Sequence, residues 1–192
     1  MTRFWWVRHG PTHAKGMVGW SDLPADLSDS AALARLSGFL PTRAVVVSSD
    51  LSRARATADA ITGGRSRLPD DADLREMHFG DWEMKHFDQV SATDAELVRR
   101  FYETPGTIRA PGGDSWNDLS ARVGVAVDRL ARAHPGGDII VVSHMGAILT
   151  QVQRALNLTA YETLAHRIDN LSVTEITMRA DGWRAGRINH HP

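Results

Sequence analysis

The stretch Arg3–Thr12, RFWWVRHGPT, decides the fold, because a run of mostly apolar residues in it stops abruptly at polar ones. Its first part, 3–8 (RFWWVR), lacks the regular alternation of a half-exposed strand and is typical of a strand buried on both faces. Two later runs, AVVVS (44–48) and DIIVVS (138–143), have the same character. Strands covered on both faces occur mainly in parallel sheets, so these three runs predict a parallel core.

Helix-like segments follow these strands and could supply the cover that such a sheet needs. Leucines recur at helical spacing in 28–40, and a longer apolar stripe runs through 115–134. The segment 51–62 is followed by two glycines, which are typical of a helix end. We expect Asp50 to cap the helix predicted over 51–62 and Asp114 to cap the helix predicted over 115–134.

The C-terminal part of the chain predicts two antiparallel strands. Residues 171–179 and 183–189 are strand-like and are joined at Asp181–Gly182, which is a hairpin signal. Together with the alternating strands and helices, this pattern predicts an α/β fold, a three-layer α/β/α sandwich with a mostly parallel central sheet and a C-terminal hairpin. We expect one domain over 1–192, and the Gly- and Pro-rich stretch 104–114 is expected to be a surface loop.

Composition excludes several classes of protein. The chain has 192 residues, of which 42% are hydrophobic and 23% charged, and this is typical of a globular domain with a sizeable core. Its 22 lysines and arginines are balanced by 23 aspartates and glutamates, a formal charge of -1, so no basic surplus favours nucleic acid. It contains no cysteine, which excludes disulfides, thiolate metal sites and thiol nucleophiles.

No segment of the sequence has the pattern of a targeting or membrane sequence. The N-terminal residues lack the basic region and apolar run of a signal peptide, and nowhere do about 18 apolar residues follow one another. We therefore expect a cytoplasmic protein with no membrane and no nucleic-acid partner. No heptad pattern predicts an oligomeric state.

Arginine and histidine residues lie at or just after the ends of the three predicted strands. Arg8 and His9 end the first strand, Arg53 lies in the first turn of the helix after the second, and His144 follows the third. The carboxyl ends of parallel strands meet at the edge where ligands bind, so these side chains are expected to converge. Arginine forks and helix N-termini favour a phosphoryl group, and a neutral imidazole nitrogen can accept one.

Several motifs, in the order found in a known family, make this expectation more specific. They are VRHGPT (7–12), SSDLSRARATA (48–58), LREMHFGDWE (74–83), PGGDS (111–115) and VVSHMGAI (141–148). On these motifs the chain resembles the histidine phosphatase superfamily, the phosphoglycerate-mutase-like group. Within it, the chain looks similar to bacterial alpha-ribazole and broad-specificity phosphatases, which implies the same three-layer fold.

The resemblance implies a role for each matching residue. His9 would take the phosphoryl group from the substrate and later lose it to water. Arg8 and Arg53 would hold the phosphoryl oxygens, and His144 would donate a hydrogen bond to them. Glu76 would protonate the departing alcohol.

Other residues near the motifs have weaker assignments. Thr12 could reach the phosphate or orient His9 with its hydroxyl group, and Glu83 is a reserve candidate for the proton donor. Trp20 lies in a segment similar to one near the mutase site, but packing explains a loop tryptophan equally well, so we leave it out of the predicted site. The resemblance implies no metal and no organic cofactor.

The chain departs from the family pattern at four positions. Asp50 stands where proline is usual and Asp114 where glutamate is common. Met145 stands where glycine often follows the histidine, and Met84 where Trp-Glu-Gly is frequent. Met84 and Met145 would narrow the crevice if their side chains pointed into it.

Three alternatives to the leading function, a phosphomonoesterase acting on a small phosphorylated metabolite, stay open. A mutase is the runner-up, although the chain lacks the arginine that follows the glutamate in the Glu-Arg-x-Tyr-Gly segment of mutases. A metal-dependent hydrolase with His9, His144 and an acidic residue as zinc ligands is a second alternative, and a non-catalytic phosphate-binding module is a third. Substrate selection is expected to come from 13–27, 77–105 and 106–118, and the sequence does not identify the substrate.

Overall fold

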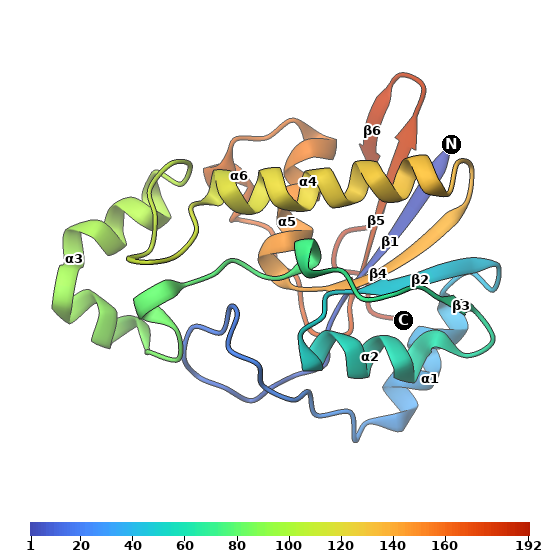
Figure 1. Cartoon of the computed structure of the whole chain (residues 1–192), viewed down its shortest axis with the longest axis horizontal. Coiled ribbons are helices and arrows are strands. Elements are labelled where there is room, and N and C mark those ends of the chain that lie inside the picture. The colour runs from blue at the N-terminus through green and yellow to red at the C-terminus, as the bar shows by residue number, and fades with distance from the viewer.

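The computed structural model describes residues 1–192 and has one six-stranded sheet with helices on both faces (Figure 1). The strands are β1 Thr2–Arg8, β2 Ala44–Ser48, β3 Ser66–Arg67, β4 Asp138–Ser143, β5 Val173–Arg179 and β6 Gly182–Ala185. The α-helices are α1 Ser30–Phe39, α2 Ser52–Thr62, α3 Phe87–Glu103, α4 Trp116–Ala133, α5 Met145–Leu156 and α6 Ala160–Thr163. Two 3-10 helices, η1 Ala72–Leu74 and η2 Gly80–Trp82, lie between β3 and α3.

The sheet is mostly parallel, which confirms the predicted fold class. Its strand order is β3-β2-β4-β1-β5-β6, and the first four strands run parallel while β5 and β6 are antiparallel to their neighbours. Arg8 of β1 lies opposite Ser143 of β4, and Ser48 of β2 lies opposite Val142. The three predicted strands therefore end at one edge of the sheet, which is where ligands bind in open parallel sheets.

Each face of the sheet has its own apolar core. Trp6 and Val141 belong to the core packed against α4 and α5, whereas Val7 and Ile140 belong to the core packed against α1 and α2. Successive residues of a strand point to opposite faces, so an uninterrupted apolar run fills both cores at once. This burial is the physical reason why the central strands lack polar alternation.

Both predicted N-caps are wrong. The N-cap of α2 is Leu51, which makes no side-chain cap, because the carboxylate of Asp50 forms two hydrogen bonds with Arg75 instead. The N-cap of α4 is Ser115, while Asp114 accepts a hydrogen bond from an arginine farther along α4. A charge-assisted contact with an arginine thus engages each aspartate, but only α2 lacks a side-chain cap, since the hydroxyl of Ser115 accepts from the N–H of Asp118 in α4.

The C-terminal hairpin is confirmed, with a shorter second strand than predicted. β5 and β6 pair antiparallel on either side of Asp181, but β6 ends at Ala185 rather than 189. The chain beyond it stays hydrogen-bonded to β5, through Gly186 and Arg187 at Glu175 and through a bridge between His190 and Val173. The predicted surface loop 104–114 contains no helix and no strand.

The helix α3 lies inside the segment that was expected to cover the crevice. Figure 1 shows it standing out from the body of the molecule at the end opposite the hairpin. It is kinked at Asp94, where the backbone leaves the helical region. Its last turn returns to the core through the buried side chain of Phe101. No helix of the chain combines the length and apolar character that crossing a bilayer requires.

Candidate active site

His9 directly follows β1 and is held in one orientation. Its backbone N–H donates to the carbonyl of Ser143, and its side chain is only 7% exposed. The Nδ1 atom lies 2.7 Å from the carbonyl oxygen of Gly10. Because a carbonyl oxygen only accepts, Nδ1 carries the proton, and the lone pair of the neutral ring lies on Nε2.

The guanidinium of Arg53 lies against this free nitrogen. Its Nε donates to Nε2 of His9 over 3.2 Å, and its two terminal nitrogens donate to the carbonyls of Ser21 and Gly19. Arg53 lies in the first turn of α2, and its side chain is completely buried. These anchors fix the guanidinium plane, so the cation cannot swing away from His9.

Burial determines the charge state of His9. Loss of solvent lowers the pKa of His9 to about 3, the charges of Arg53 and Arg8 lower it as well, and the hydrogen bond to Gly10 opposes them. A histidine with such a pKa is neutral at pH 7, so its Nε2 carries no proton and its lone pair accepts the hydrogen bond from Arg53. Neutral imidazole is the nucleophilic form of the residue.

Arg8 supplies the second cation of the site. One of its terminal nitrogens donates to the carbonyl of Ile168 over 2.6 Å, while its buried Nε has no partner. Burial lowers the pKa of Arg8, and the carboxylates of Glu76 and Asp169 oppose that shift. Arg8 and Arg53 thus donate only to neutral acceptors, which leaves two largely buried positive charges without an ion pair. Such a pair of cations favours an anion.

His144 lies behind His9 rather than on the wall of the cavity. It is completely buried and forms the N-cap position of α5, and its ring centroid is 5.1 Å from that of His9. Its Nε2 lies 2.9 Å from Oγ of Ser49, and its Nδ1 has no partner. Burial lowers the pKa of His144 well below its ordinary value, so its ring is neutral.

Glu76 lines the same cavity as His9, Arg8 and Arg53, and backbone groups hold its carboxylate. One carboxylate oxygen accepts from the backbone N–H of Met77 over 2.9 Å, and the other accepts from the N–H of Gly146 over 3.0 Å. Gly146 lies in the first turn of α5, whose N-terminus carries a partial positive charge. The carboxyl group is therefore held in place by backbone donors that leave its remaining lone pairs open.

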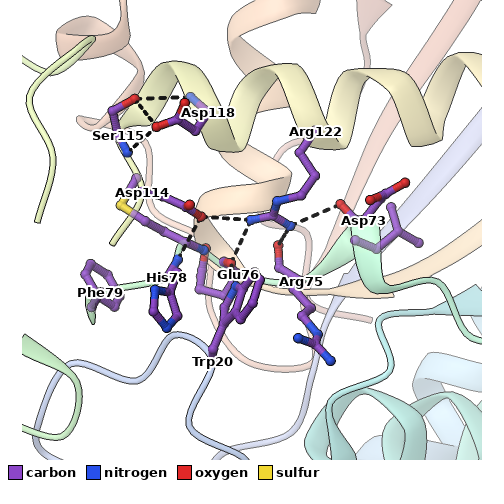
Figure 2. A network of polar contacts seen from close by, with 12 residues as sticks. Trp20, Asp73, Arg75, Glu76, His78, Phe79, Asp114, Ser115, Asp118 and Arg122 are labelled. Carbon is purple, nitrogen blue, oxygen red and sulfur yellow. Dashed lines mark hydrogen bonds and ion pairs between the residues drawn. The ribbon is translucent and has the colours of Figure 1, made fainter. Parts of the chain in front are cut away.

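Arg122 of α4 holds the backbone that carries Glu76, as Figure 2 shows. Its guanidinium donates to the carbonyls of Asp73, Arg75 and Glu76 over 3.0–3.2 Å. It also donates to the carboxylate of Asp114 over 3.1 Å. Four acceptors on one planar fork tie this irregular segment to a helix.

Trp20 braces the same residue from the opposite direction (Figure 2). Its indole N–H donates to the carbonyl of Glu76 over 2.8 Å. The guanidinium carbons of Arg75 and Arg122 lie 4.7 and 5.6 Å from its ring centroid, within the range of cation–π contacts. Trp20 therefore supports the site without lining its cavity.

Glu83 has a different task from Glu76. Its carboxylate accepts hydrogen bonds from the backbone of Gly19, Trp20, Ser21 and Phe79, and from the hydroxyl of Ser21. Burial raises the pKa of Glu83, but these hydrogen bonds outweigh burial, so the pKa lies below its ordinary value. An acid with a lowered pKa and a committed carboxylate is a poor proton donor, so the geometry favours Glu76 over this reserve candidate.

A cavity of about 230 Å³ connects the predicted residues. Its polar walls are formed by Arg8, His9, Thr12, Arg53 and Glu76. The hydroxyl of Thr12 is engaged only by a long contact of 3.4 Å from the N–H of Ala14. Five of the six predicted site residues thus line one hollow, and the sixth, His144, lies directly behind it.

The two methionines that were expected to narrow the crevice behave differently. Met145 lines the cavity, although its side chain is 41% exposed. Met84 is 49% exposed and lines neither this cavity nor the apolar one beside it, so the condition for narrowing the crevice is not met at Met84. Its backbone has φ of +63°, which explains why glycine suits this position.

Three further residues hold the site, and the sequence analysis missed them. Asn170 donates to the carbonyl of His9 over 2.8 Å, and Ser49 contacts His144. Arg122 holds the segment that carries Glu76. Ser49 lies within a quoted motif and could have been found there, but Asn170 and Arg122 are far from the motifs and carry no local signal.

The chain was compared with known proteins and solved structures. Residues 4–191 match the family described as "Histidine phosphatase superfamily (branch 1)". "Bifunctional protein Rv2228c" of Mycobacterium tuberculosis is 32% identical over 203 residues, covering 97% of this chain and 53% of that protein. The chain therefore spans about half the length of this mycobacterial relative.

Two other matches cover nearly the whole of both chains. "Probable phosphoglycerate mutase GpmB" of Citrobacter koseri is 28% identical over 204 residues, covering 99% of this chain and 95% of that protein. The solved structure named "Alpha-ribazole Phosphatase from Shigella flexneri" has a TM-score of 0.84 and 26% identity, covering 98% of this chain and 96% of that one. These matches confirm the resemblance inferred from the motifs: the chain belongs to the histidine phosphatase superfamily.

Proposed function

We propose that the chain hydrolyses a small phosphomonoester through a phosphohistidine on His9, with Glu76 as the proton donor. One observation carries this proposal: a neutral, buried His9 lines one cavity with two cations, Arg8 and Arg53, that have no carboxylate partner. A phosphoryl group would satisfy both cations and meet the lone pair of Nε2 in the same place.

In the first step, the Nε2 lone pair attacks phosphorus. The phosphorus–nitrogen bond forms while the phosphorus–oxygen bond to the alcohol breaks, and the departing oxygen takes a proton from the protonated carboxyl of Glu76. The ring gains positive charge, which the hydrogen bond from Nδ1 to the carbonyl of Gly10 stabilises. Arg8 and Arg53 neutralise the charge on the phosphoryl oxygens.

In the second step, water takes the place of the alcohol. The carboxylate of Glu76 accepts a proton from the water as its oxygen attacks phosphorus, the phosphorus–nitrogen bond breaks, and the lone pair returns to Nε2. Phosphate leaves, and Glu76 is protonated again. Thr12, which lines the cavity, is proposed as a further donor to the phosphoryl oxygens, and His144 is proposed to act through its packing against the ring of His9.

Mutase chemistry is the second candidate, favoured by the name of the Citrobacter koseri relative. A mutase must return the phosphoryl group to a substrate alcohol instead of water. In a phosphoglycerate mutase the substrate also carries a carboxylate that needs a cation. The residue after Glu76 is Met77, which is apolar and buried, so this position supplies no such cation. This feature favours hydrolysis.

The proposal is tested by trapping the intermediate. An aryl phosphate is mixed with the protein in excess EDTA, the reaction is stopped with alkali, and the peptide containing His9 is weighed by mass spectrometry. We expect phosphate release and the mass of one phosphoryl group on that peptide. Release that stops in EDTA, or turnover with no phosphorylated peptide at any quench time, would overturn the mechanism. Phosphate transfer to glycerate without release would favour the mutase.

A further inference from the structure

A second, apolar cavity opens off the phosphate site. It shares Glu76, Phe79 and Met145 with the first cavity, so the two hollows adjoin at the proposed proton donor. The alcohol oxygen of a substrate must lie beside Glu76, and the rest of the alcohol must extend away from the phosphoryl group. The second cavity is therefore in the position that the leaving group would occupy.

The walls of this cavity are almost entirely apolar. They come from the end of α3, the loop after it and the first turns of α4 and α5, and include Phe101, Tyr102, Ile108, Trp116 and Leu149. Phe101 is in edge-to-face contact with Tyr102, with ring centroids 5.2 Å apart. Such packed aromatic side chains form a stiff wall rather than an adaptable polar one.

Apart from Glu76, the side-chain polar groups on these walls already have contacts. The indole N–H of Trp116 donates to the side-chain oxygen of Gln153 over 2.7 Å, and the hydroxyl of Tyr102 contacts the sulfur of Met17. No lysine or arginine lines the cavity, and its only charged residue is Glu76. A sugar or glycerate group placed here would leave hydroxyls or a carboxylate without partners, at a cost in binding.

The size of the cavity limits its occupant. It encloses about 120 Å³. For comparison, an apolar cavity of about 150 Å³ in another protein accepts benzene. One aromatic ring or a short branched hydrocarbon fills this volume, and a larger group would extend out of the cavity.

We infer that the substrate is a phosphomonoester of a small apolar alcohol, whose ring or branched hydrocarbon occupies the cavity bounded by Phe101, Ile108 and Trp116. This inference rests on the proposed function, because it assigns the leaving group of that reaction. It names the substrate class that the sequence analysis could not identify.

The test compares three esters of primary alcohols, so that the chemistry of the departing group stays similar. They are benzyl phosphate, glycerol 3-phosphate and 3-phosphoglycerate. We expect kcat/KM for benzyl phosphate to exceed both others by roughly tenfold or more. Binding is measured separately by calorimetry, with benzylphosphonate and 2,3-dihydroxypropylphosphonate as analogues that cannot be hydrolysed, and benzylphosphonate is expected to bind more tightly.

A variant of the cavity wall adds a second readout. Ile108→Asn places an unpaired amide in the cavity and is expected to lower the ratio of kcat/KM for benzyl phosphate to that for glycerol 3-phosphate by roughly fivefold or more. Val125→Asn is the matched control, because Val125 is a 59% exposed residue of α4 outside both cavities. The control is expected to keep the ratio of the unmodified protein.

Each outcome separates the inference from the proposed function. Hydrolysis with equal or greater kcat/KM for the two hydrophilic esters overturns the inference and leaves the proposed function intact. Absence of hydrolysis, together with preferential binding of benzylphosphonate, overturns the proposed function and supports the cavity assignment. No hydrolysis and no preference between the phosphonates overturns both. If Ile108→Asn does not fold, the phosphonate comparison on the unmodified protein still decides.

Discussion

The two sides of the site are held by different kinds of structure. On the nucleophile side (Arg8, His9, Arg53 and His144), each residue ends or directly follows a strand, or lies near the start of a helix, and the register of β1 and β4 brings the strand ends together. On the proton-donor side, Glu76 lies in an irregular segment and depends on the side chains of other elements. The first side is placed by the sheet, and the second by a polar network. Substitutions on the two sides should therefore differ in how strongly they affect catalysis and how strongly they affect stability.

Removal of the nucleophile should have the largest effect. His9→Ala deletes the atom that receives the phosphoryl group, so we expect phosphate release to fall by about 10³-fold or more. The sheet that places this residue should stay intact, and Arg8 and Arg53 should still bind phosphate weakly. Turnover is measured by phosphate release, and binding by calorimetry with inorganic phosphate. Near-normal turnover in this variant would refute the role of His9.

Removal of the proton donor should have an effect that depends on the leaving group. Glu76→Gln keeps the shape of the side chain but cannot donate a carboxyl proton, so kcat for benzyl phosphate should fall about 10²- to 10⁴-fold. An aryl phosphate with an acidic leaving group needs little protonation, and its kcat should fall much less. Glu83→Gln is the comparison. If Glu83→Gln showed this dependence and Glu76→Gln did not, Glu83 would be the donor.

Acid should destabilise the nucleophile side. The pKa of His9 is about 3 in the folded chain and lies near 6.5 in an unfolded one, so between these values the unfolded state binds the extra proton. Stability therefore rises with pH through this window and is lost as pH falls, by about 1.3 kcal/mol per pH unit for this residue. Urea unfolding at pH 4, 5 and 6 measures the slope. His9→Asn should reduce the slope by about that amount, and an unchanged slope would contradict the buried neutral form.

The same contrast explains which features could be predicted from sequence. The residues of the nucleophile side follow apolar runs that are recognisable as buried strands, and parallel topology brings their ends together. The brace on Glu76 could not be found this way, because Arg122 lies 46 residues from Glu76 and nothing nearby marks it as a partner. The N-cap prediction failed at Asp50 for a similar reason, since its partner Arg75 is 25 residues away.

The apolar cavity was also beyond prediction from sequence. Its walls come from α3, α4, α5, the loop after α3, the segment around Glu76 and the end of α6, and most of the contributing residues resemble ordinary core on their own. Only the packing of Phe101 and Trp116 near Gly146 shows that the core stops short of filling the space beside Glu76. Motifs identify the shared chemistry of the phosphate, whereas the leaving group is read by residues outside the motifs.

A substitution at the contact between α5 and Glu76 should move the carboxylate of Glu76 without removing it. A Cβ added at Gly146 would lie 2.3 Å from a carboxylate oxygen of Glu76, which lies at the end of a flexible side chain. Gly146→Ala should therefore displace the carboxylate with little loss of stability, and kcat for benzyl phosphate should fall roughly tenfold. Gly124→Ala in α4, where a Cβ would meet nothing within 4 Å, is the control and should leave kcat unchanged. Equal kinetics for both variants would show that Glu76 tolerates movement.

The smallest expected effect concerns the irregular chain beyond Glu76. Met84 has φ of +63°, a left-handed conformation that costs an L-residue about 1–2 kcal/mol, while glycine adopts it freely. Glycine also loses about 0.5–1 kcal/mol more backbone entropy on folding. Met84→Gly should therefore stabilise the protein by about 0.5–1 kcal/mol, measured by urea unfolding.

Lys85→Gly is the matched control for this change, because Lys85 is exposed and its φ is not positive. It should destabilise the protein by the entropy difference alone, about 0.5–1 kcal/mol, so the two neighbouring substitutions should have opposite signs. Neither should change kcat/KM, since Met84 lies outside both cavities. Equal destabilisation by both would mean that the left-handed turn carries no strain. A change in kcat/KM for Met84→Gly alone would instead show that the turn at Met84 helps to position Glu76. The proton-donor side would then include a turn that makes no hydrogen bond to Glu76.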